Sequence, residues 1–93
     1  SWAKSIYWMS SFVMRKNFGV SRDELIKRLK INGIDTRPVF PTISKYPMWY
    51  SEIKNKNAHE ISQNGINLPS GHNLSEDHVD HICNILVKQL GYN

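Results

Sequence analysis

Two stretches of apolar residues at helical spacing, each opened by a serine, constrain the fold of this 93-residue chain more than any other feature. The first begins after Ser21, an N-cap whose capping box is completed by Glu24. Asn32-Gly33 ends it, because glycine tolerates the left-handed backbone conformation. The inward stripe is expected at Leu25, Ile26 and Leu29, with Ile31 near the end.

The C-terminal stretch has the same organisation. Ser75 is its expected N-cap, acidic residues follow at the positive end of the helix dipole, and Gly91 ends it. Its buried stripe is expected at Val79, Ile82, Leu86 and Leu90, with Cys83 beside it as a small buried hydrophobe. A shorter helix is expected over residues 57–64, with Asn57 as its N-cap and Gly65 as its stop.

Three extended segments accompany these helices. Residues 1–15 carry apolar side chains on both parities, which predicts a first strand covered on both faces. Residues 34–40 contain Pro38, which has no amide hydrogen to donate and therefore predicts an edge strand or a strand running into a loop. Residues 66–68 form a brief strand. The order predicts an α+β fold (an α/β sandwich), with a small mixed or antiparallel sheet and helices packed on it.

Composition excludes several classes of protein. A single cysteine excludes an intramolecular disulfide framework and a Cys-based zinc site. No apolar run approaches the roughly 18 residues of a membrane span, and no stretch resembles a signal peptide, so we expect a cytoplasmic protein without a membrane partner. The formal net charge of +4, with ten aromatic residues, mildly favours anionic partners. A stand-alone basic module for RNA or nucleotides therefore stays open, with candidates Trp2, Tyr7, Trp8, Arg15 and Lys16.

Residues 36–41 (TRPVFP) carry the most informative chemistry. The guanidinium of Arg37, beside a rigid proline, suits a carboxylate or a phosphate, or else an internal salt bridge with Asp35 or Glu52. Phe40 could stack on a flat ring or pack in the core. His78 and His81 have helical spacing, but no further ligand completes a zinc site, so no metal is expected.

Four passages in this order resemble the C-terminal part of the DegT/DnrJ/EryC1/StrS-type sugar aminotransferases. They are SIYWM at 5–9, SRDELIKRL at 21–29 running on to GIDTRPVFP at 33–41, YPM at 46–48, and GINLPS at 65–70. The TRP-x-F form is most similar to the perosamine-synthase-like branch. Other branches carry His-Tyr in place of Val39-Phe40, and many relatives carry His where Ser44 stands.

The resemblance implies that residues 1–93 are one small C-terminal domain of a larger fold-type-I enzyme. That parent enzyme would use pyridoxal 5'-phosphate, would be a homodimer, and would transfer an amino group from glutamate to a nucleotide-linked keto-sugar for surface polysaccharide biosynthesis. In the family the Schiff-base lysine lies upstream, and none of the eight lysines here lies in a matching motif.

The fragment alone is therefore expected to bind no cofactor, to hold no catalytic residue and to be inactive. Nucleic acid is not an expected partner of the parent. The resemblance places the substrate-binding residues at Arg37, Phe40, Ser44, Lys45 and Tyr46. A non-catalytic scaffold domain with an aminotransferase-like fold remains an alternative, because the deciding lysine would lie upstream.

Overall fold

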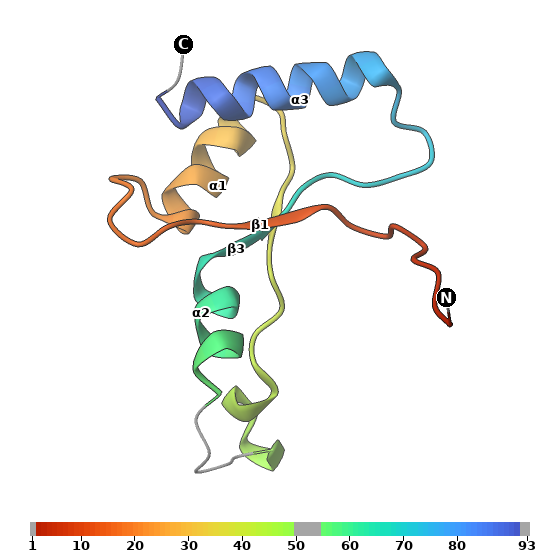
Figure 1. Cartoon of the computed structure of the whole chain (residues 1–93). Coiled ribbons are helices and arrows are strands. Elements are labelled where there is room, and N and C mark those ends of the chain that lie inside the picture. Colours follow the sequence, from red (N-terminus) through yellow and green to blue (C-terminus); the bar gives the residue numbers. More distant parts are fainter. Residues whose placement is uncertain (1, 50–54, 92–93) are drawn as a thin grey trace.

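A small antiparallel sheet lies at the centre of the computed structural model, which describes residues 2–49 and 55–91 (Figure 1). Strands β1 (Ser11–Val13), β3 (Gly65–Asn67) and β2 (Arg37–Pro38) follow in that order across the sheet. Ser11 and Arg37 both lie opposite Asn67. β3 is therefore the central strand, and the prediction that Pro38 occupies an edge is confirmed, because an edge strand tolerates a missing donor.

Helices lie at both ends of this antiparallel sheet, and the strands and helices together form an α+β fold. Figure 1 shows α1 (Arg22–Ile31) and α3 (Glu76–Gln89) packed together at one end, and α2 (Lys56–Asn64) at the other. Two short 3-10 turns, η1 (Ile43–Lys45) and η2 (Pro47–Trp49), lie at the α2 end. The expected fold class is thus confirmed.

The core is small and lies between α1 and the sheet. The side chain of Ser21 accepts a hydrogen bond from the backbone N–H of Glu24 at 3.2 Å, which confirms Ser21 as the N-cap of α1. The Glu24 carboxylate accepts from Nε of Arg28 at 3.2 Å, so only the Ser21 half of the predicted capping box is present. Gly33 follows with a φ of +80°, as the predicted stop requires. The buried apolar side chains are those of Met14, Leu25, Leu29, Ile34 and Ile66.

The chain is more open than an independent domain of its size. Its radius of gyration is 15.5 Å, whereas a compact domain of this length has about 12 Å. Its accessible surface is 7983 Å², whereas a compact monomer of this mass exposes about 5,500 Å². Roughly 2,400 Å² of surface is therefore exposed beyond what the mass alone explains.

The first strand is shorter than predicted, and the expectation that it is covered on both faces is wrong for this chain. β1 has three residues, and the preceding Ile6, Tyr7 and Trp8 are exposed. Its partner β3 also has only three residues, and the pairing ends on the N-terminal side with the Leu68 N–H, which donates to the Ser10 carbonyl at 2.9 Å. Tyr7, at φ +50°, also departs from the extended conformation.

Four helix details also differ from the predictions. Asn55, not Asn57, is the N-cap of α2, and Asn57 lies inside that helix. Ile31 is exposed at the end of α1. Val79 and Cys83 are exposed as well, because α3 packs on the core only through its other face. That face consists of Ile82, Ile85, Leu86 and Leu90, which are partly buried.

α3 begins with a reciprocal cap, and loss of this cap is expected to lower the stability of the fold. The Ser75 hydroxyl accepts from the His78 N–H, and the His78 ring Nδ1 accepts from the Ser75 N–H, both at 3.2 Å. Ser75→Ala is expected to lower the free energy of unfolding by about 0.5–2 kcal/mol in urea denaturation. Ser75→Asp keeps an acceptor and should retain stability. Equal stability of the alanine variant and the wild type would contradict this role for the cap.

Candidate functional site

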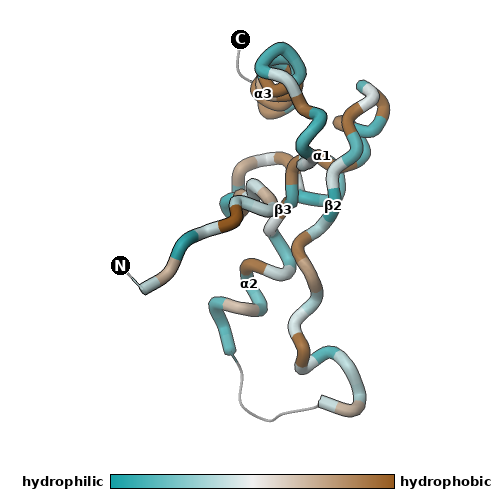
Figure 2. The backbone as a smooth tube through the Cα atoms, turned by 90° about the vertical axis from the view of Figure 1, so that its right-hand side faces the viewer, coloured by the Kyte–Doolittle hydropathy of each residue, from teal (hydrophilic) through white to brown (hydrophobic). Residues whose placement is uncertain are grey.

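The five predicted substrate-binding residues follow one another along a single irregular segment. Arg37 lies on β2, Phe40 follows the strand, Ser44 and Lys45 lie on η1, and Tyr46 is the C-cap of η1. Figure 2 shows this segment running beside α2 and away from α3. All five side chains are exposed. The structure therefore gathers them along one surface, and they do not enclose a cavity.

Arg37 makes an ion pair that leaves its guanidinium accessible. Its Nη2 lies 3.4 Å from Oδ2 of Asp35, and the two side chains are 78% and 72% exposed. An exposed pair of this kind contributes less than about 1 kcal/mol. The internal salt bridge considered from the sequence is thus present but weak, and Glu52 lies outside the described residues. Arg37 can still meet an external anion.

Phe40 lies outside the core, and its exposed ring contacts another exposed ring. The ring centroids of Phe40 and Trp8 are 6.5 Å apart and the planes are tilted by 35°. Both side chains are 64% exposed. Trp8 lies 32 positions earlier in the chain and precedes the opposite edge strand, so spacing along the sequence could not reveal this contact.

The η1 turn positions Ser44, Lys45 and Tyr46 through short-range hydrogen bonds. The Ser44 hydroxyl donates to Oγ1 of Thr42 at 3.2 Å, and the Lys45 N–H donates to the Thr42 carbonyl at 3.0 Å. The Tyr46 N–H donates to the Ile43 carbonyl at 3.0 Å. These local bonds fix the backbone of the turn, while the side chains of Lys45 and Tyr46 remain accessible to solvent.

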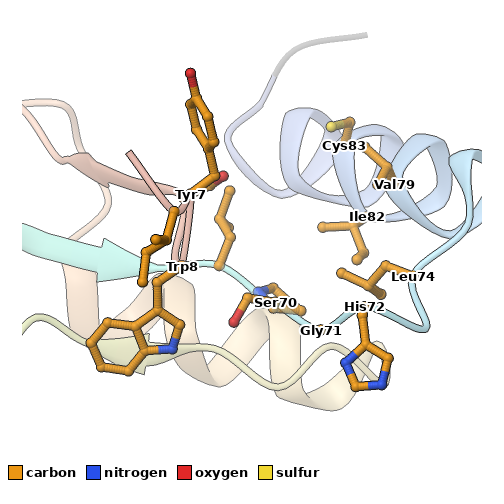
Figure 3. Close-up of a pocket in the computed structure, with 13 residues that line it drawn as sticks. Tyr7, Trp8, Ser70, Gly71, His72, Leu74, Val79, Ile82 and Cys83 are labelled. Atoms are coloured by element: carbon orange, nitrogen blue, oxygen red, sulfur yellow. The ribbon is translucent and has the colours of Figure 1, made fainter. Parts of the chain in front are cut away.

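A separate cleft of about 640 Å³ opens between the N-terminal segment, the loop after β3, and α3 (Figure 3). Its walls are mainly apolar, and in Figure 3 the rings of Tyr7 and Trp8 point to opposite sides of the N-terminal segment. None of the five predicted substrate-binding residues lines it. Sequence reasoning missed the cleft, whose walls include Ile6, Trp8, Leu68, His72, Val79 and Cys83.

The described side chains do not fit a pyridoxal phosphate site within this chain. A Schiff-base lysine has to face an enclosed site that takes the cofactor. Every lysine in residues 2–49 and 55–91 is exposed, and none lines the 640 Å³ cleft. Within the same residues, no three His, Cys, Asp or Glu side chains form a group suited to a metal ion. No helix in this part of the chain is long and apolar enough to cross a membrane.

Comparison with known proteins gives the family. Residues 1–87 match the model of the DegT/DnrJ/EryC1/StrS aminotransferase family. The chain belongs to this family. The resemblance found in the sequence is thereby confirmed for nearly the whole chain.

Curated relatives in this aminotransferase family include GDP-perosamine synthases. The chain is 38% identical over 84 residues to the GDP-perosamine synthase of Vibrio cholerae, covering 86% of the chain and 23% of the relative. It is 42% identical over 79 residues to that of Escherichia coli O157:H7, covering 83% of the chain and 21% of the relative. The chain thus spans less than a quarter of the length of these relatives.

A solved aminotransferase shares the fold. The structure is PseC of Helicobacter pylori, an aminotransferase involved in the biosynthesis of pseudoaminic acid. The TM-score is 0.77 at 20% sequence identity, over 88% of this chain and 23% of that structure. At this identity the likeness concerns the fold alone, and it agrees with the α+β arrangement described above.

Proposed function

We propose that this chain is the small C-terminal domain of a pyridoxal phosphate-dependent aminotransferase that aminates a nucleotide-linked keto-sugar, with glutamate as the amino donor. The observation that carries the proposal is the match to GDP-perosamine synthases over more than four fifths of the chain. The product would serve surface polysaccharide biosynthesis in the cytoplasm, as the family resemblance implies. The parent enzyme would be a homodimer, and the cofactor and its lysine would belong to the large domain.

The surface of the chain supports a domain that packs against further protein. The excess of roughly 2,400 Å² is comparable to the area buried in obligate interfaces. Exposed apolar side chains such as Ile6 and Val79 line the open cleft, where a monomeric protein rarely leaves a large apolar patch. Contact with the large domain would cover the α3 wall of this cleft, where Val79 lies, and would leave the Trp8 ring accessible. The isolated chain is accordingly proposed to lack aminotransferase activity.

Within this proposal Arg37 binds an anionic substrate group. Its guanidinium is exposed, and its weak pair with Asp35 can be exchanged for the carboxylate of glutamate or the diphosphate of the sugar nucleotide. Phe40 and the residues from Ser44 to Tyr46 lie on the same exposed segment and would line the substrate cleft of the parent. The choice of keto-sugar by the parent enzyme would depend on this segment.

Amination of the keto-sugar by the full-length protein, and its loss on changing Arg37, tests the proposed function. Arg37→Ala is expected to lower kcat/KM by about ten- to a hundredfold for the substrate that it binds, because one charge-assisted contact is lost. Arg37→Lys keeps the charge without the planar fork and should give an intermediate value.

A matched control separates this role from a general effect of charge. Arg15 is also an exposed arginine, and it lies just beyond β1. Arg15→Ala should leave kcat/KM near the wild-type value. Full kcat/KM for both substrates in Arg37→Ala would remove the substrate role of Arg37.

A further inference from the structure

Trp8 and Phe40 form an aromatic pair that stays largely exposed to solvent. Their ring centroids lie 6.5 Å apart, within the range of a direct aromatic contact. Each side chain is 64% exposed, and neither belongs to the buried core. At this separation the two rings contact each other, so a third ring would lie against their exposed sides rather than between them.

The two segments that carry these rings have an electropositive composition. Residues 2–22, which include Trp8, contain four Lys or Arg residues and no Asp or Glu. Residues 36–49, which include Phe40, contain Arg37 and Lys45 and no Asp or Glu, and Asp35 just before them makes the exposed pair with Arg37. Exposed aromatic rings on two segments rich in cations suit a ligand that combines a planar base with phosphate groups, because bases stack on aromatic side chains and cations attract phosphate.

We propose that Trp8 and Phe40 form a stacking platform for the nucleobase of the nucleotide-linked substrate, with Arg37 and Lys45 attracting its diphosphate. This inference rests on the proposed function and adds to it one substrate-binding residue, Trp8, on a segment that precedes the opposite edge of the sheet. The Trp8–Phe40 contact joins the N-terminal segment to the residues that follow β2. Nucleotide binding would thus engage both segments at once.

Nuclear magnetic resonance of the isotopically labelled full-length protein that contains this chain tests the platform directly. The chain has three tryptophans, and Trp2 and Trp49 are exposed like Trp8, so their indole N–H signals serve as internal controls. On titration with GDP, the Trp8 signal should shift in a saturable way, while the Trp2 and Trp49 signals stay in place. No saturable shift of the Trp8 signal at millimolar GDP would overturn the proposal.

Substitution of each ring tests the same platform. Phe40→Leu should weaken GDP binding about five- to a hundredfold, and Trp8→Leu by a similar factor, as loss of one stacking contact does. Trp49→Leu is the matched control, because it removes an exposed tryptophan on η2, and should leave GDP affinity unchanged. The backbone amide spectrum of each variant verifies that the fold is retained. Wild-type affinity for GDP in both Phe40→Leu and Trp8→Leu would contradict stacking.

Two further ligands distinguish stacking of the nucleobase from attraction of phosphate alone and from binding of RNA. Inorganic pyrophosphate should leave the Trp8 signal largely in place, and a shift as large as that with GDP would show attraction of phosphate alone and overturn stacking of a base. A single-stranded oligoribonucleotide that binds far more tightly than GDP, with steep salt dependence, would instead indicate an RNA-binding surface and overturn the proposal. Failure here leaves the amino-transfer assay unaffected, so the two proposals fail separately.

Discussion

Leu29→Ala is expected to lower the free energy of unfolding by about 2–5 kcal/mol, the largest effect that we anticipate in this chain. Leu25 and Leu29 are fully buried on consecutive turns of α1, and the described core has only three further buried apolar side chains. Truncating one leucine removes its contacts and leaves a cavity that a sheet of three short strands cannot close. Small domains have total stabilities of about 5–15 kcal/mol, so a large share would be lost.

Ile31→Ala is the matched control for this prediction. Ile31 lies on the same helix and is exposed, so removing its side chain opens no cavity. Urea denaturation followed by circular dichroism should give a large decrease in midpoint for Leu29→Ala and little change for Ile31→Ala. Similar midpoints for the two variants would contradict a core organised around α1.

Gly65→Ala is expected to destabilise the fold by about 1–3 kcal/mol through overpacking at the junction of α2 and β3. An added Cβ would lie 2.5 Å from the carbonyl oxygen of Ile61 and 2.6 Å from Cγ2 of Val39. The Ile61 contact is with helix backbone, and Gly65 itself pairs with Val13 across the sheet. Neither element can withdraw without disturbing the strand pairing.

Gly71→Ala controls for the general cost of replacing glycine. Its added Cβ meets only the flexible end of the Asn73 side chain within 3 Å, so that side chain can turn away. Thermal unfolding should show a clear fall in Tm for Gly65→Ala and little change for Gly71→Ala. A Gly65→Ala protein as stable as the wild type would show that the junction is less tightly packed than described.

Local rules gave correct predictions where a few neighbouring residues decide the conformation. Ser21 and Ser75 cap their helices as predicted, because an N-cap depends on hydrogen bonds within one turn. Pro38 lies on an edge strand, because its missing donor excludes the centre of a sheet. The family predicted from the TRP-x-F and GINLPS passages is also confirmed, by a family match that extends over residues 1–87.

Predictions that depended on tertiary partners were less successful. Apolar residues before β1, such as Ile6, predicted a covered strand, yet side-chain type cannot say whether the covering surface lies in the same chain. Cys83 was expected to be buried on the same reasoning and is exposed beside the cleft. The contact between Trp8 and Phe40 depends on how the segments beside the two edge strands approach, which no local pattern encodes.

The visible absorption spectrum of the full-length protein that contains this chain, recorded before and after adding glutamate, tests the central claim most directly. We expect a band of bound pyridoxal phosphate that shifts to that of the pyridoxamine form, as the first half of amino transfer requires. A protein that binds no cofactor, even when pyridoxal phosphate is supplied, would contradict the account and favour a scaffold domain with an aminotransferase-like fold.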